Sequence, residues 1–444
     1  MRGQAWLIGG ALVVAAAVAV TAYVSRAPRS PFDGVANASP ASSPDNEYVA
    51  RLADCVACHS TPGNEPFTGG LKMGTPMGAL YSTNITPDPD TGIGRYTLAD
   101  FDNAVRRGVA KEGHRLYPAM PYPSYAKLTD DDVRKLYSYF MLEVAPVNQR
   151  NLPPEIGFPL NQRWGLAFWN GLFVDDRPYA AREDQDAVWN RGAYLVQGPG
   201  HCGACHTERG WAFNEKAFDE RDDDFLGGAL LDAWYASNLR GDNVLGLGKW
   251  TEQEVVQYLK VGRNAHGTVY GSMLDAFNNS TQFMSDADLT AIARYLKSLS
   301  PRGDDIHYEY DSGTQEALNS GNLNARGAKV YLSQCSTCHS RDGRGYGDLL
   351  PPLAGNAGVL QEDPTSVLNI ILNGAGRLVV NGVPDSYRMT PFRVLLSDQQ
   401  IADVATFIRN SWGNAAGEVD VSQVQKLRSA TDPSSDHVIV LRLR

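Results

Sequence analysis

The sequence repeats one stretch three times: Cys55-Val-Ala-Cys-His59, Cys202-Gly-Ala-Cys-His206 and Cys335-Ser-Thr-Cys-His339. All six cysteines of the 444-residue chain fall in these stretches, so none is left for a disulfide. Two cysteines at this spacing can reach the two vinyl groups on one edge of a haem and hold it by thioether bonds. The histidine that follows supplies the proximal nitrogen to the iron. The pattern therefore predicts three covalent c-type haems, attached through Cys55, Cys58, Cys202, Cys205, Cys335 and Cys338 and ligated by His59, His206 and His339.

Zinc binding and dithiol redox chemistry are the alternative explanations of a Cys-x-x-Cys pair. Zinc needs four ligands, and a zinc site gives no reason for a histidine directly after each pair. The chain has only 8 histidines, which makes three such coincidences improbable. A thioredoxin-like motif would accompany a βαβ pattern, which the sequence lacks. Haem attachment is therefore the interpretation that explains all three stretches.

A haem that only transfers electrons needs a second strong iron ligand, which is commonly methionine. Methionines also fill hydrophobic cores. Only eight exist here, however, and one falls before the closing helix of each repeat. The rival Met284 lies close to a predicted helix cap, so we expect it to pack in the core. His114 and His266 could form a bis-histidine site, but the third repeat has no counterpart. The predicted sixth ligands are Met120, Met273 and Met389.

The sequence around the first two haem motifs is duplicated. The first copy reads Tyr81-Ser-Thr-Asn-Ile and then Gly92-Ile-Gly-Arg-Tyr-Thr97, and the second reads Tyr235-Ala-Ser-Asn-Leu and then Gly246-Leu-Gly-Lys-Trp-Thr251. Each copy runs into a predicted helix that begins with a capping box, Thr97 with Asp100 and Thr251 with Glu254. The third repeat diverges but keeps the order of its parts.

Each repeat closes with a capped helix that has one apolar face. The caps are Thr129, Ser285 and Ser397, and each is followed three residues later by Asp or Gln. Apolar residues then recur at helical spacing, as Val133, Leu136, Tyr137 and Phe140 do in the first repeat. No strongly alternating strand pattern appears. The fold class is therefore predicted to be mainly α, with three class I cytochrome c-like domains in tandem.

These signals divide the chain into eight segments. The joint between the first two domains carries Trp164, Phe168, Trp169, Leu172 and Phe173 at helical spacing. We expect this amphipathic helix to pack between domains, with membrane contact as the alternative. The segments are 1–29, a signal peptide or membrane anchor; 30–45, a linker; 46–150, unit I; 151–186, the joint; 187–301, unit II; 302–321, a linker; 322–412, unit III; and 413–444, a polar tail expected to be an irregular arm.

The N-terminus carries an apolar run, residues 5–24, broken only by Thr21. As a helix it would span about 30 Å, the thickness of a bilayer's hydrocarbon core. Its length favours an uncleaved anchor over a cleaved secretory signal, and both export the rest of the chain. The charged fraction is 20% and the net charge −10, without a long run of Lys and Arg, so nucleic acid is not an expected partner.

Beyond the haem motifs, the sequence resembles the three-haem cytochrome c subunit of bacterial membrane-bound periplasmic dehydrogenases of the alcohol, aldehyde, gluconate and fructose type. The resemblance covers roughly residues 46–412. The stretches that carry it are Phe67-Thr-Gly-Gly-Leu, Tyr81-Ser-Thr-Asn-Ile-Thr-Pro-Asp, Gly113-His-Arg-Leu-Tyr-Pro-Ala-Met-Pro-Tyr-Pro-Ser-Tyr, Trp211 and Asn279-Ser-Thr-Gln-Phe-Met.

The resemblance implies an electron-transfer subunit that is no enzyme by itself and has no catalytic residues. Its implied partners are a catalytic dehydrogenase subunit of the pyrroloquinoline quinone, flavin or molybdenum type, a small third subunit in some complexes, ubiquinone and the membrane. It would lie at the periplasmic face of the bacterial inner membrane. Many family members have a hydrophobic C-terminal stretch, whereas this sequence ends in Arg442-Leu-Arg444. We expect the N-terminal run to anchor it instead.

Two other functions compete with this expectation. A haem peroxidase needs an iron with an open face and acid–base groups above it, which the plausible methionine in each unit argues against. A free-standing multihaem shuttle would carry electrons without a permanent partner.

Overall fold

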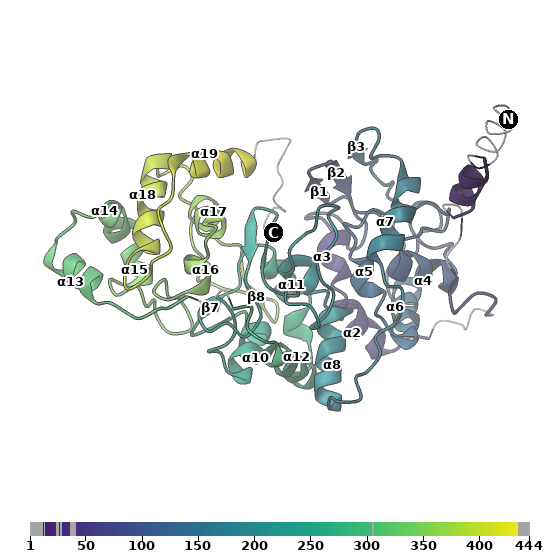
Figure 1. Ribbon diagram of the computed structural model, residues 1–444, viewed down its shortest axis with the longest axis horizontal. Helices are drawn as coiled ribbons and strands as arrows, with labels where there is room; N and C mark the ends of the chain where they lie inside the picture. The colour runs from purple at the N-terminus through teal and green to yellow at the C-terminus, as the bar shows by residue number, and fades with distance from the viewer. Residues whose placement is uncertain are drawn as a thin grey trace, which may run out of the picture.

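The computed structural model describes residues 12, 14–23, 26, 29–35, 41–303 and 306–433. This part of the chain is mainly α, as predicted, with four small antiparallel sheets. Figure 1 shows the three units in order along the long axis of the molecule, unit I in purple and blue, unit II in teal and unit III in green and yellow.

Unit I begins with a helix whose C-terminal end leads into the first haem motif. That helix, α2, packs against the closing helix α6, and the predicted capping box of Thr97 and Asp100 starts α4. A short sheet, in which Lys72 pairs with Tyr81, lies beyond the motif. The elements are α2 (Pro44–Leu52), α3 (Cys55–His59), β1 (Lys72–Thr75), β2 (Gly78–Tyr81), α4 (Leu98–Arg107), α5 (Tyr122–Tyr125) and α6 (Asp130–Leu142), with β3 (Glu155–Ile156) added at the edge of β2.

Unit II repeats this arrangement. Its opening helix α8 packs on its closing helix α12, and the capping box of Thr251 and Glu254 starts α10. The elements are α8 (Ala187–Gln197), α9 (Gly203–His206), β4 (Ala229–Leu231), β5 (Trp234–Ala236), α10 (Glu252–Val261), β6 (Arg263–Asn264), β7 (Gly267–Thr268), α11 (Met273–Asn279), η2 (Thr281–Phe283) and α12 (Asp286–Ser298).

Unit III contains the third motif, a hairpin and a closing helix. Ser397 and Gln400 form the capping box of that helix, α18. A further helix, α13 (Gly313–Ser320), lies in the linker before the unit. The elements are α14 (Ala328–Val330), η3 (Tyr331–Cys335), α15 (Ser336–His339), α16 (Ala357–Leu360), α17 (Thr365–Asn373), β8 (Val379–Val380), β9 (Val383–Pro384) and α18 (Asp398–Arg409).

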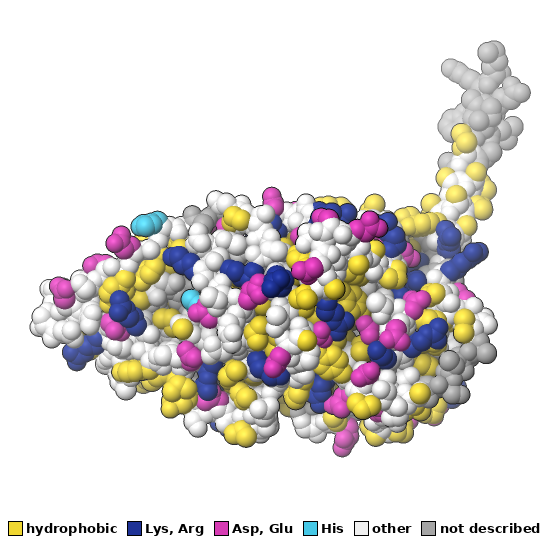
Figure 2. Space-filling model, turned by 90° about the horizontal axis from the view of Figure 1, so that it is seen from below, with side chains coloured by type: hydrophobic (Ala, Val, Ile, Leu, Met, Phe, Trp, Pro, Cys, Tyr) yellow, Lys and Arg dark blue, Asp and Glu magenta, His cyan; other side chains and the backbone are white. Residues whose placement is uncertain are grey.

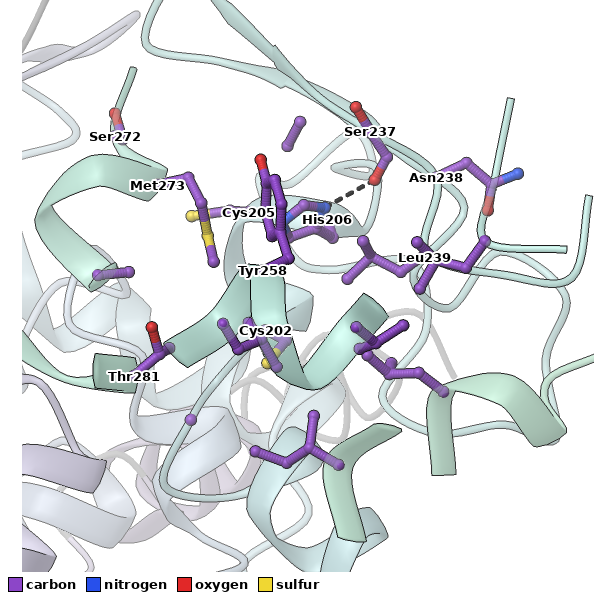
Figure 3. Close-up of a pocket in the computed structure, with 18 of the residues that line it drawn as sticks. Cys202, Cys205, His206, Ser237, Asn238, Leu239, Tyr258, Ser272, Met273 and Thr281 are labelled. Carbon is purple, nitrogen blue, oxygen red and sulfur yellow. Dashed lines mark hydrogen bonds between the residues drawn. The ribbon is translucent and has the colours of Figure 1, made fainter. Parts of the chain in front are cut away.

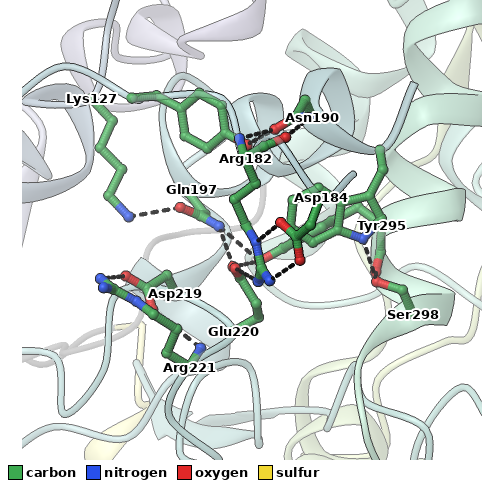
Figure 4. A network of polar contacts seen from close by, with 12 residues as sticks. Lys127, Arg182, Asp184, Asn190, Gln197, Asp219, Glu220, Arg221, Tyr295 and Ser298 are labelled. Atoms are coloured by element: carbon green, nitrogen blue, oxygen red, sulfur yellow. Dashed lines mark hydrogen bonds and ion pairs between the residues drawn. The ribbon is translucent and has the colours of Figure 1, made fainter. Parts of the chain in front are cut away.

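The apolar faces predicted for the three closing helices are buried, including Val133, Leu289 and Ile401. One hydrophobic cluster runs from unit I into unit II, whereas unit III has its own. Polar contacts also join the first two units. Lys127 of unit I donates to the Gln197 side chain of unit II over 2.8 Å, and Gln197 donates to Glu220 over 2.8 Å (Figure 4). Units I and II therefore share a core.

The joint between units I and II contains η1 (Arg163–Gly165) and α7 (Leu166–Phe173). One face of α7 packs as predicted, since the Trp169 indole donates to the Ala212 carbonyl of unit II over 2.8 Å. A neighbouring face of α7 exposes Phe168 and Leu172 to solvent, and the exposed ring of Trp164 from η1 lies against Phe168. The ring of Tyr23 lies against Phe168, with the two centroids 5.5 Å apart.

Most of the segment predicted as a signal or anchor lies outside the described residues. Residues 14–23 are helical, and Figure 2 shows this helix projecting from the body with apolar side chains on its surface. Among the residues described, no helix has both the length and the apolarity needed to cross a bilayer.

The tail after residue 412 is not the irregular arm that we expected. Residues Val421–Ala430 form helix α19, which packs on α17 and α18. Val424 and Leu427, three positions apart, are buried in the core of unit III. The prediction failed because only these few apolar residues anchor an otherwise polar helix. The short strand that the apolar run from Val438 would form falls within residues 434–444, which lie outside the described part of the chain.

Candidate haem sites

Each haem motif forms a short helical turn that ends at its histidine. In all three, the Nδ1 atom of the histidine donates a hydrogen bond to a backbone carbonyl. The distances are 2.7 Å from His59 to Thr83, 2.7 Å from His206 to Ser237 and 3.1 Å from His339 to Pro351. A histidine that donates through Nδ1 keeps its lone pair on Nε2, the atom that binds iron. The three rings are therefore held in the tautomer that a proximal ligand requires.

The first two of these carbonyls come from the duplicated stretches of the sequence. Thr83 and Ser237 each precede an asparagine, and each asparagine turns the chain through its side chain. Asn84 accepts from the Thr86 amide over 2.9 Å, and Asn238 accepts from the Arg240 amide over 2.8 Å. Our sequence analysis identified the repeat but missed its role. The duplication of these two stretches was the sequence signal that could have revealed this role.

Burial shapes the acid–base state of the motifs. It lowers the pKa values of His59, His206 and His339, which favours the neutral, ligating form. It also raises the pKa values of Cys55, Cys58, Cys202, Cys205 and Cys335 to about 12. Redox-active cysteines have lowered pKa values, so these shifts argue against dithiol redox chemistry.

The second motif opens into a cavity of about 250 Å³ lined largely by apolar side chains. Cys202, Cys205 and His206 line it, and Figure 3 shows Met273 pointing into it from the start of α11. Met284 also lines this cavity and is buried. A cavity with two cysteines, an imidazole and a thioether sulfur fits a c-type haem. The structure brings both candidate methionines to it, so the choice of Met273 stays a prediction.

The third motif faces a smaller apolar cavity of about 70 Å³. Cys335, His339 and Met389 line it together, with valine and isoleucine side chains of α17 and α18 around them. Met389 lies 50 positions after His339 in the sequence, and the fold brings the two residues to one space. This residue set also fits a c-type haem.

In unit I, Met120 lies just before α5. Met120 and Cys55 are partly buried and pack against the same hydrophobic cluster. The rival histidine of unit II is engaged elsewhere, because the Nε2 atom of His266 lies 3.0 Å from Glu254 and its ring stacks on Trp250. His114 lies 3.8 Å from Glu112 at the surface.

The sites of neighbouring units meet. Leu52 and Asp54 of unit I line the cavity of unit II, as does Ala357 of unit III. Helix α11 of unit II also packs against α3, the helix that carries the first motif, so the first two sites lie close together. The second site therefore lies between the other two.

A buried acid flanks the second motif. Glu215 is 4% exposed, and a Cβ atom added to Gly203 of the motif would lie 2.7 Å from its Oε2 atom. Burial raises the pKa of Glu215 to about 7, although Arg209 at 3.6 Å and Lys127 oppose the shift.

Comparison with known proteins identifies the family of the chain. A family model described as cytochrome c matches residues 324–412. The "alcohol dehydrogenase (quinone), cytochrome c subunit" of Gluconacetobacter polyoxogenes is 49% identical over 87% of this chain and 84% of the relative. The "gluconate 2-dehydrogenase cytochrome c subunit" of Pantoea cypripedii is 49% identical over 86% and 88%, respectively. The "fructose dehydrogenase cytochrome subunit" of Gluconobacter japonicus is 36% identical over 86% and 82%.

Proposed function

The chain belongs to the family of cytochrome c subunits of membrane-bound dehydrogenases, and from this premise we propose that it carries electrons through three covalent haems from a catalytic subunit to ubiquinone. Its relatives are electron-transfer subunits rather than catalytic ones. The observation that carries the proposal is the set of three attachment turns with histidines preset as iron ligands.

The residues of each site have separate tasks. The two cysteines would attach the haem, the histidine Nε2 and the methionine sulfur would bind its iron, and the apolar cavity would limit access of water. The haem supplies the one-electron chemistry when bound. A thioether ligand and a dry surrounding both raise a haem's reduction potential, so the cavities of units II and III favour ready acceptance of electrons.

The order of the sites supports a relay. Because the cavity of unit II is lined from both neighbours, electrons that enter at one end of the molecule would pass through unit II to reach the other end. The shared core of units I and II holds their two sites at a fixed separation. The catalytic partner is proposed to oxidise an alcohol, a sugar acid or a sugar, since the relatives belong to dehydrogenases of those substrates.

We further propose that the chain is held at the periplasmic face of the inner membrane. The apolar N-terminal run supplies the anchor. The contact of Tyr23 with Phe168 supports this, because it seats the end of the run beside the exposed face of α7. Aromatic side chains such as Trp164 prefer the membrane–water interface, where α7 would then lie.

The membrane position is tested with a spin label at Leu172→Cys, which is 72% exposed on α7. In vesicles, the label should be more accessible to oxygen than to a water-soluble nickel reagent. The matched control is Val394→Cys in unit III, which is 97% exposed and should show the reverse preference. Equal behaviour of the two labels would contradict the proposed orientation.

The relay function is tested by haem counting, co-purification and reconstitution. Denatured protein should carry three thioether-bound haems, and a dehydrogenase subunit should co-purify with it. The isolated chain should oxidise no alcohol or sugar, whereas the complex should reduce a ubiquinone analogue with such a substrate. Oxidation of substrate by the chain alone would refute the relay.

A further inference from the structure

The hairpin of unit III is held by side chains of unit II. The Asn278 side chain accepts from the Val379 amide over 2.9 Å and donates to the Arg377 carbonyl over 3.1 Å. The Gln282 side chain accepts from the Asn381 amide over 3.0 Å and donates to the Val379 carbonyl over 2.9 Å. The α11–η2 segment thus binds β8 as a neighbouring strand would, through two paired amides.

An ion pair fixes the residue that follows this hairpin. Arg263, at the start of β6 in unit II, pairs with Asp385 of unit III, and both side chains are largely buried. The Asp385 carboxylate also accepts from the Tyr387 amide over 2.9 Å. The backbone amide of Asp385 donates to the Leu378 carbonyl over 2.7 Å. One carboxylate therefore connects unit II to the turn that leads into Met389.

Unit III holds the other side of this turn. The Ala375 amide donates to the Met389 carbonyl over 3.0 Å. Gly374 has a φ of 72°, and a Cβ atom there would lie 2.6 Å from the Met389 oxygen, so the two backbone segments pack without room for a side chain. The Met389 segment is therefore clamped between its own unit and unit II.

We propose that Arg263, Asp385, Asn278 and Gln282 form a cross-unit latch that positions Met389 on the third iron. The inference rests on the haem attachment and Met389 ligation of the proposed function. Removing one partner of a buried ion pair leaves a buried charge unpaired and is strongly destabilising. The turn before Met389 would then open locally, and the sixth position of the iron would become accessible to outside ligands.

The test uses the full-length, haem-loaded chain without a dehydrogenase. Arg263→Gln and Asp385→Asn should each make cyanide bind one of the three ferric haems about tenfold faster, because the opened turn no longer protects the iron. Arg263→Lys keeps the charge and should restore most of the protection. Met389→Leu supplies the reference for a third site without sulfur. The matched control is Arg294→Gln, which removes an ion pair with Glu252 at the surface of unit II and should change nothing.

Each outcome decides the proposal. Fast binding in the latch variants, with the spectrum of Met389→Leu, supports it. Wild-type rates in the latch variants beside a fast Met389→Leu overturn the latch alone. If Met389→Leu changes neither rate nor spectrum, the ligand assignment falls and the latch with it, while the haem count still stands. Should the charge variants fail to fold, Asn278→Ala removes only two hydrogen bonds, and wild-type behaviour of that variant would also count against the latch.

Discussion

The Tyr48 hydroxyl of unit I donates a hydrogen bond to the Asp288 carboxylate of unit II over 2.7 Å. The relationship is reciprocal, because the Tyr194 hydroxyl of unit II donates to the Asp132 carboxylate of unit I. Both carboxylates lie in the first turn of a closing helix, α12 or α6. Each unit thus binds the start of the other's closing helix. This symmetric exchange, together with the shared core, fixes the first two haem sites relative to each other.

These contacts predict that removing the two tyrosine hydroxyls lowers the free energy of unfolding by unequal amounts. Tyr194→Phe should lower the free energy of unfolding by about 2 kcal/mol, because it leaves Asp132 without a buried partner. Tyr48→Phe should cost about 1 kcal/mol, because Asp288 keeps its ion pair with Arg191 at 2.7 Å. Denaturant unfolding followed by haem absorbance measures both values.

The control for this experiment is Tyr346→Phe, since Tyr346 is exposed in unit III. It should leave the midpoint unchanged. If Tyr194→Phe is as stable as this control, the hydroxyl does not hold the two units together.

The same carboxylates show what sequence can and cannot predict. Thr97, Thr251 and Ser397 form complete capping boxes, as expected, since a box involves only four neighbouring residues. Thr129 and Ser285 accept from the amides of Asp132 and Asp288, but these two carboxylates are engaged by tyrosines of the neighbouring unit. Helix starts are local and predictable, whereas partners from another unit are not.

The candidate sites also combine residues that the sequence predicts with residues that it does not. Cysteines and histidine within five residues reveal haem attachment, because the chemistry is local. The distal ligand comes from a distant segment, and the cavity of unit II contains both Met273 and Met284. The sequence also gave no indication that Asp385 is paired with Arg263, since 122 positions separate them.

Replacement of the candidate methionines tests the distal ligands. Met120→Leu, Met273→Leu and Met389→Leu should each remove about one third of the near-infrared sulfur-to-iron absorbance and lower one reduction potential, because thioether sulfur favours ferrous iron. Met284→Leu is the control for unit II, with similar volume and the same cavity. If Met284→Leu removes the signal and Met273→Leu does not, Met284 is the ligand.

Glu215 predicts a pH-dependent change in stability. Its pKa is about 7 in the folded protein against an ordinary value of 4.5, so burial of the carboxylate opposes folding once the acid ionises. Below pH 4.5 Glu215 is protonated in both the folded and the unfolded protein, so it does not lower the free energy of unfolding. Stability is lost as the pH rises from 4.5 to 7, and the loss is constant above that. Glu215→Gln should therefore stabilise the protein by about 3 kcal/mol at pH 8 and hardly at all at pH 4.

The control is Glu208→Gln. Glu208 lies near the same motif, but Lys216 lowers its pKa, so its effect has the opposite sign. This variant should lose a little stability at pH 8, consistent with an exposed ion pair. A gain of equal size in both variants would show that the effect reflects net charge rather than burial.

Two truncations test whether the tail after residue 412 stabilises unit III or binds the catalytic dehydrogenase subunit. Removal of residues 419–444 deletes Val419, Val424 and Leu427 from the core of unit III. It should lower the stability of that unit by about 4 kcal/mol or more. It also removes Arg428, whose guanidinium binds Asp398 over 2.6 Å and the Arg393 carbonyl near Met389. The near-infrared signal of the third haem should weaken as well.

Removal of residues 434–444 alone leaves α19 and these contacts in place. This shorter truncation should retain three haems, full stability of unit III and the complete near-infrared signal. If all three are retained, loss of the catalytic subunit on purification would assign binding of that subunit to the last residues of the chain. Retention of that subunit would show that the tail serves unit III instead. Equal stability of the two truncations would contradict the role of α19, since the buried side chains of Val424 and Leu427 distinguish them.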